Sequence, residues 1–199
     1  MLAYFIVAVP VSHTNCRDQV YFLHGGKTKT GKPRYWVSQK SEGNLLESIP
    51  EGYEIYERPG GLVFVRKIPK TPILPHELQC VQDQLAPLNN QLAAYIESKC
   101  GAYVRTLPAE SQRYLEINRS RHESEIRDKE IIIYEVSRGN AMQVMKFTLY
   151  DEETREYLAY RWCFRGREGW KSIGSRGQLQ DLACKYCPAL GTDQFYELW

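Results

Sequence analysis

The chain has 199 residues, of which 43% are hydrophobic and 25% charged, with a formal net charge of +2 at pH 7 and a pI near 8.2. These values are close to the averages for globular domains, and they exclude a disordered chain, a collagen and a coiled coil. The length allows one sizeable core or two small ones. Because nucleic-acid-binding domains are usually far more basic, any electrostatic argument for that function depends on local clusters of charge.

The apolar run MLAYFIVAVPVS at residues 1–12 is the segment most similar to a targeting signal. It has no basic region before it and no clear cleavage site, and it is about half as long as the roughly 20 residues that a membrane-spanning helix needs. We interpret it as a buried strand or as the result of a start codon placed too early, and we expect no membrane partner. The six cysteines are scattered and form no compact disulfide framework, which favours reduced thiols in the cytoplasm.

Two hairpins are predicted in residues 19–67. QVYFLH and RYWVSQK are rich in β-forming residues and flank a turn of Gly, Lys and Thr. YEIYE and LVFVRKI flank RPGG, which has the Pro and Gly residues of a tight connection. We expect residues 1–68 to form an N-terminal module of antiparallel β-hairpins.

The segment IPKTPILPH comes next. It contains Pro69, Pro72 and Pro75, a spacing that neither a helix nor the interior of a sheet tolerates well. The segment therefore predicts a linker at residues 69–76, followed by a second domain at residues 77–199.

Helical spacing follows the linker in HELQCVQDQL and LNNQLAAYIESKCG. Leu88, Leu92 and Ile96 recur at intervals of about one helical turn, and Gly101 stands where a C-cap glycine belongs. These residues predict one helix that is kinked or split at Pro87.

The remaining segments complete the predicted architecture. Residues 109–130 are rich in helix formers, but RYLEI within them could alternate as a strand, and both interpretations stay open. IIIYEV, MQVMKFTLY, YLAYRWCF and WKSIG predict a meander of antiparallel strands, and QLQDLACKYC predicts a last helix. The predicted fold class is α+β, with N-terminal antiparallel β-hairpins, a central helix, an antiparallel meander and a C-terminal helix.

Gly26, Gly31 and Lys32 match most of a phosphate-binding loop. Such a loop needs a Ser or Thr after the Lys to bind magnesium, and a helix that begins there. This chain has Pro33 in that position, and the strand-like RYWVSQ follows it. We therefore predict a charged hairpin turn at this point, and no cofactor.

Basic and aromatic residues gather in two stretches of the chain. The combination is typical of single-strand nucleic-acid binding, because cations neutralise phosphates and aromatic rings stack on bases. The aromatic residues also have strand spacing, so packing within a sheet is the alternative use. The candidate binding residues are Lys27, Lys29, Lys32, Arg34, Tyr35 and Trp36 in the first stretch and Arg165, Arg167, Trp170, Lys171 and Arg176 in the second.

His13, Cys16, Cys184 and Cys187 together have the spacings of a tetrahedral zinc set. CKYC falls inside the predicted last helix and not in a turn that presents both sulfurs, and free cysteines are usually buried. We therefore predict no metal site and keep the four residues only as candidate ligands.

The sequence contains only a fragment of a catalytic motif. The sequence HGG at residues 24–26 is similar to an oxyanion loop, but the chain has no G-x-S-x-G nucleophile motif. His76 and His122 lie in segments dense with Glu, and we interpret both as solvated. No catalytic residue is predicted.

The block KTKTGKPRYWVSQKSEGNLLESIPEGYEIYERPGGLVFVRK resembles a segment of uncharacterised bacterial proteins, in which a GKPRY turn precedes an IPEGYEIYE strand and a VFVRK strand. CFRGREGWKSIG and LGTDQFYEL are similar to the ends of the same proteins. The resemblance implies a recurrent bacterial architecture, and it carries no known activity or site residue.

These features favour a non-catalytic cytoplasmic binding protein that holds a macromolecular partner. A protein partner is favoured slightly over a nucleic acid, because exposed strand edges recruit partners by strand addition and the net charge is small. The alternatives are a nucleic-acid-binding protein that uses the basic aromatic turns, and a small enzyme whose site residues are distant in sequence.

Overall fold

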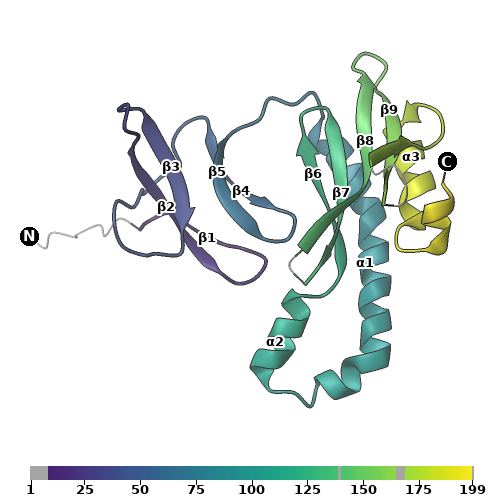
Figure 1. Cartoon of the computed structure of the whole chain (residues 1–199), viewed down its shortest axis with the longest axis horizontal. Helices are drawn as coiled ribbons and strands as arrows, with labels where there is room; N and C mark the ends of the chain where they lie inside the picture. Colours follow the sequence, from purple (N-terminus) through teal and green to yellow (C-terminus); the bar gives the residue numbers. More distant parts are fainter. Residues whose placement is uncertain (1–8, 139, 165–168, 199) are drawn as a thin grey trace, which may run out of the picture. The chain divides into compact units, whose positions relative to one another are not determined.

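A computed structural model describes residues 9–138, 140–164 and 169–198 of the chain. It divides into two compact units, Met1–Pro69 and Lys70–Trp199. The predicted α+β class is confirmed, because antiparallel hairpins, a central helix, an antiparallel meander and a C-terminal helix all form (Figure 1). Residues 1–8 of the predicted first strand lie outside the described residues.

The first unit is built from two antiparallel sheets. One sheet has the strand order β1-β2-β3, and β4 and β5 form a separate hairpin, so both predicted hairpins are confirmed. Asn15 connects the two sheets, because its Nδ2 donates to the Gly61 carbonyl oxygen over 2.7 Å. The strands are β1 (Ser12–Thr14), β2 (Val20–Lys27), β3 (Pro33–Ser38), β4 (Tyr53–Arg58) and β5 (Leu62–Lys67).

The turn between β2 and β3 has the predicted form of a charged hairpin. The Thr28 N–H donates to the Lys32 carbonyl oxygen over 2.8 Å, and Gly31 has a φ of 79°, which a glycine adopts without strain. Pro33 begins β3 opposite Lys27 on β2. The segment where a phosphate-binding loop requires a helix is therefore a strand.

The second unit contains a sheet with the strand order β10-β9-β8-β7-β6, and β11 pairs with β9. The helix α1 extends past the end of this sheet, and α2 returns the chain toward it (Figure 1). The helices are α1 (Pro75–Val104), α2 (Ala109–Ile117) and α3 (Leu179–Tyr186), with short 3₁₀ turns at Cys187–Ala189 and Asp193–Glu197. The strands are β6 (Arg121–Arg127), β7 (Glu130–Ser137), β8 (Asn140–Asp151), β9 (Glu156–Cys163), β10 (Gly169–Ser172) and β11 (Gly177–Gln178).

The main core of the second unit lies between one face of the sheet and the helices α1 and α3. Ile131 and Ile133 alternate along β7 toward Val81 and Leu85 of α1, and all four are at most 3% exposed. The intervening residue Ile132 belongs to a smaller cluster on the opposite face. In this arrangement β6 is the edge strand, and α1 packs against it.

Several boundaries differ from the predicted ones. Pro75 starts α1, because its missing N–H costs nothing at the first helical position, and Ile73 is 4% exposed in the core, so part of the predicted linker belongs to the second unit. The helix continues without a break through Pro87 and past Gly101, which is therefore not its C-cap. RYLEI lies in α2 and is helical.

Candidate functional sites: a basic hairpin and a pocket beside β6

The β2–β3 hairpin collects the first stretch of candidate residues at one end of the first unit. Lys27, Lys29, Lys32 and Arg34 are all exposed there. Residues 19–41 contain five Lys and Arg residues and no Asp or Glu. The hairpin is therefore strongly basic, although the whole chain is nearly neutral.

Trp36 lies on the same face of this hairpin as His24, its cross-strand neighbour. The two rings are stacked, with centroids 5.5 Å apart and an interplanar angle of 8°, and Arg34 Cζ lies 5.7 Å from the Trp36 ring. A Cβ at Gly26 would come within 3.1 Å of Trp36 Cζ3, so the glycine leaves room for the ring. Trp36 remains 38% exposed.

Tyr35 points to the other face of the hairpin. Its ring packs edge to face on Tyr53, with centroids 4.9 Å apart. Tyr35 is therefore a packing residue in the first unit, and the exposed aromatic surface of the hairpin comes from Trp36.

The second stretch of candidate residues does not form a comparable surface among the described residues. Trp170 packs against the cluster around Ile132, edge to face with Trp162 at 5.2 Å. Arg176 forms an ion pair with Glu156 at 3.5 Å, and Lys171 is half-buried on β10. Arg165 and Arg167 lie outside the described residues.

The four candidate zinc ligands are hydrogen-bonded to Glu57, buried in the core or exposed on α3. His13 Nε2 lies 2.8 Å from Glu57 Oε2, and the Cys16 N–H donates to Glu57 Oε1 over 2.8 Å. Cys187 is fully buried in the core, whereas Cys184 is exposed on α3. Within the described part of the chain, no three His, Cys, Asp or Glu residues are grouped so that they could hold a metal ion.

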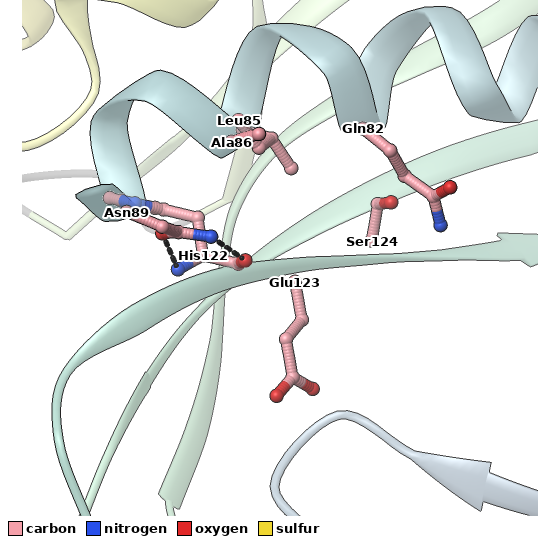
Figure 2. A pocket seen from close by; sticks show the side chains of 7 residues that line it. All are labelled: Gln82, Leu85, Ala86, Asn89, His122, Glu123 and Ser124. Carbon is pink, nitrogen blue, oxygen red and sulfur yellow. Dashed lines mark hydrogen bonds between the residues drawn. The ribbon is translucent and has the colours of Figure 1, made fainter. Parts of the chain in front are cut away.

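A pocket of about 310 Å³ lies between α1 and β6 (Figure 2). Its helical side is formed by residues at intervals of one turn, and its floor includes the buried Leu85. Figure 2 shows that Ser124 of β6 points toward α1, whereas Glu123 points away from it. The lining residues are Gln82, Leu85, Ala86, Asn89, His122, Glu123 and Ser124.

Side chains close the edge of β6 at two points. Asn89 Nδ2 donates to the His122 carbonyl oxygen over 2.9 Å, and the His122 N–H donates to Asn89 Oδ1 over 2.7 Å (Figure 2). Thr71 Oγ1 donates to the Asp128 carbonyl oxygen over 2.6 Å. The two Asn89 bonds satisfy both backbone groups of His122 on β6, and the Thr71 bond satisfies the Asp128 carbonyl in the turn that follows β6.

Between these points, the outward backbone groups of two residues of β6 are unpaired within the described residues. Alternate residues of an antiparallel edge strand direct their N–H and C=O groups outward, so Ser124 and Ile126 follow the same outward row as His122, and Asp128 lies in the turn after β6. Neither residue has a hydrogen bond on that side among the described parts of the chain. The open window is therefore two residues long and lies beside the pocket.

The pocket also holds two buried polar atoms, His122 Nδ1 and Ser124 Oγ, that have no hydrogen-bond partner among the described residues. Burial lowers the pKa of His122 and outweighs the smaller rise that Glu135 causes, so the imidazole is neutral at neutral pH. Each unpaired buried polar group costs about 1 to 3 kcal/mol. Because the two atoms are not hydrogen-bonded to each other, they do not form a nucleophile and base pair.

A larger pocket of about 540 Å³ lies where α1 and α3 begin. The charged side chains that line it include Glu77 and Arg155, which are bonded to each other. The two charges of this ion pair therefore satisfy each other within the pocket.

Sequence reasoning missed the pocket beside β6. The Glu-rich sequence around His122 predicts a solvated side chain, which is wrong because His122 Nδ1 is buried, and residues 109–130 are compatible with both helix and strand. His122 and Ser124 alternate, which places them on one face only if the segment is a strand. The sequence did not decide between strand and helix here, so this alternation could not identify the pocket.

No protein-family model, curated protein sequence or solved structure matches this chain. None of the helices in the described residues is both long enough and apolar enough to cross a membrane.

Proposed function

We propose that this protein is a non-catalytic binding protein that takes an extended segment of a protein partner as an added strand on β6. The observation that carries the proposal is the open edge at Ser124 and Ile126 between the bonds made by Asn89 and Thr71. An edge with unpaired backbone groups pairs readily with another extended chain. The side-chain hydrogen bonds at His122 and at Asp128 limit the pairing to a short segment.

Main-chain pairing alone gives weak binding. The window offers at most one N–H and one C=O from each of Ser124 and Ile126, and each hydrogen bond contributes about 1 kcal/mol net. Together they correspond to a Kd of about 1 mM. Tighter binding therefore requires a partner side chain in the adjacent pocket, where Leu85 supplies an apolar floor and Ser124 Oγ supplies an unpaired hydroxyl.

The residues that line the pocket indicate the chemistry of the bound segment. The pocket presents an imidazole, a hydroxyl and the Gln82 amide, and no lysine or arginine lines it. An uncharged side chain with an amide or hydroxyl group would pair with the exposed Gln82 amide, and it would reach the buried His122 Nδ1 and Ser124 Oγ where binding separates α1 from β6. We therefore expect a peptide with such a residue next to the pairing positions.

Selection from a random-peptide display library, followed by titration of the chosen peptides against the full chain, tests the proposal. Binding should protect the Ser124 and Ile126 amides from hydrogen exchange, because both N–H groups become donors to the peptide. Ser124→Pro removes one outward donor without breaking the ladder to β7, and should weaken binding at least about 10-fold.

Ser124→Ala is the matched control, because it keeps the backbone N–H and removes only the hydroxyl. It should retain main-chain pairing and amide protection at Ile126. The proposal is wrong if the selected peptides bind the Ser124→Pro variant as tightly as the original chain, or if no peptide binds more tightly than about 1 mM.

A further inference from the structure

The β2–β3 hairpin combines charge and an exposed ring in a way that the proposed strand addition on β6 does not use. Lys27, Lys29, Lys32 and Arg34 are exposed, and the sequence around them has no acidic residue to neutralise them. Among the described residues, no ion pair engages these four side chains. The hairpin therefore presents positive charge that is compensated only by solvent ions.

Trp36 is held in a fixed orientation inside this charged region. Its ring is stacked on the buried His24, whose Nε2 lies 3.1 Å from the Lys40 carbonyl oxygen. Gly26 leaves room beneath the ring, and Arg34 lies near it. The ring is 38% exposed, so part of its surface remains for contact with a further flat group.

We propose that the β2–β3 hairpin binds a single-stranded nucleic acid, with a base stacked on Trp36 and the neighbouring phosphates bound by Lys27, Lys29, Lys32 and Arg34. Cations that track a backbone beside an aromatic ring are the means by which proteins hold unpaired strands. A base that is already paired and stacked in a duplex cannot offer its face to Trp36. An acidic peptide would satisfy the cations but would leave the ring unused.

The charge count predicts the salt dependence. Single-strand binding loses affinity with a slope of about 0.7 for each phosphate that is neutralised, so the four hairpin cations give a slope of about −3. Raising the salt concentration from about 50 to about 200 mM should then weaken the affinity roughly 50-fold.

Fluorescence anisotropy of the full chain with labelled mixed-sequence DNA and RNA oligonucleotides, single-stranded and duplex, tests the proposal. The triple variant Lys27→Gln, Lys29→Gln and Lys32→Gln should reduce the salt slope by about 2. Trp36→Leu should weaken single-strand binding about 10-fold and leave the salt slope unchanged, because it removes stacking and no charge.

A second triple variant, Lys70→Gln, Lys99→Gln and Lys185→Gln, removes the same charge from exposed positions in the second unit. It should leave binding nearly unchanged. The hairpin lysines are exposed in a turn, so their replacement tests the site even where Trp36→Leu lowers the stability of the fold.

Three results would overturn the proposal. One is the absence of binding to single strands at about 50 mM salt. The second is an equal loss of affinity in the two triple variants, which would show that net charge and not the hairpin matters. The third is competition by polyglutamate as effective as competition by unlabelled oligonucleotide, which would assign the hairpin to acidic protein partners.

Discussion

Arg155, in the turn between β8 and β9, holds the carboxylate of Glu77 in the first turn of α1 with two hydrogen bonds. Arg155 Nε donates to Glu77 Oε1 over 3.0 Å, and its Nη2 donates to Oε2. The same carboxylate accepts the Leu74 N–H over 2.8 Å, and Glu77 is only 6% exposed. One buried side chain therefore caps α1 and joins it to the sheet.

Acid should weaken this junction. Burial alone would raise the pKa of Glu77, but the hydrogen bonds from Arg155 and Leu74 hold it below its usual 4.5. A depressed carboxyl pKa contributes stability that is present above pH 4.5 and is lost as the pH falls through the folded-state value. Urea unfolding followed by helical circular dichroism should therefore show stability that declines below about pH 4.5.

The variant Glu77→Gln should be less stable by about 3 kcal/mol at neutral pH, because it leaves the Arg155 charge without its partner. It should also show a smaller loss of stability in acid than the original chain. Glu110→Gln, at an exposed position of α2, is the control and should change neither quantity.

His122 predicts a second pH dependence in a higher range. Because burial lowers its pKa below 6.5, the unfolded chain binds a proton there more readily than the folded chain. The stability contribution is complete above pH 6.5 and is lost as the pH falls below it. His122→Gln should remove this dependence from the unfolding free energy, whereas the exposed His76→Gln should preserve it. Equal profiles for all three proteins would contradict the assignment.

The unpaired hydroxyl of Ser124 should be a cost to the free protein. Ser124→Ala removes a buried polar group that has no partner and should stabilise the chain by about 1 kcal/mol. Ser120→Ala is the matched change at the start of the same strand, where Ser120 Oγ donates to Ser137 Oγ over 3.0 Å. It should destabilise by about 1 kcal/mol. Opposite signs in the two denaturation midpoints are the expected result.

Alanine variants at Gly174 and Gly191 distinguish the cost of backbone strain from the cost of steric overlap. Both have a positive φ, of 72° and 76°, so an alanine costs about 1 kcal/mol at either position. A Cβ at Gly174 would also lie 2.0 Å from the Tyr186 hydroxyl oxygen, whereas the nearest atom to a Cβ at Gly191 is 4.0 Å away. Gly174→Ala should therefore cost about 2 kcal/mol more than Gly191→Ala.

A double variant tests this interpretation. Tyr186→Phe removes the oxygen that the new Cβ would meet, so most of the additional cost of Gly174→Ala should disappear in that background. If the cost persists in thermal unfolding, its origin is the backbone at Gly174 and not Tyr186.

Local patterns predicted most of the fold. The alternation in IIIYEV and MQVMKFTLY and the turn residues between them specify the meander, because a strand pattern and a tight turn require only neighbouring residues. Pro33 likewise excluded a helix after the glycine-rich turn, and β3 begins there. The predicted end of the helix at Gly101 was wrong, because α1 continues to Val104, and only the packing of the second unit brings Ile73 into the core.

The two candidate sites also differ in how far the local sequence predicts them. The basic hairpin is predictable from the residues alone, because Lys27 to Trp36 are close along the chain and one turn brings them together. The packing of Trp170, and the position of His122 and Ser124 beside Asn89 of α1, follow from the folded arrangement. Burial and unpaired edges depend on which distant segments pack together, and no local pattern of residues contains that information.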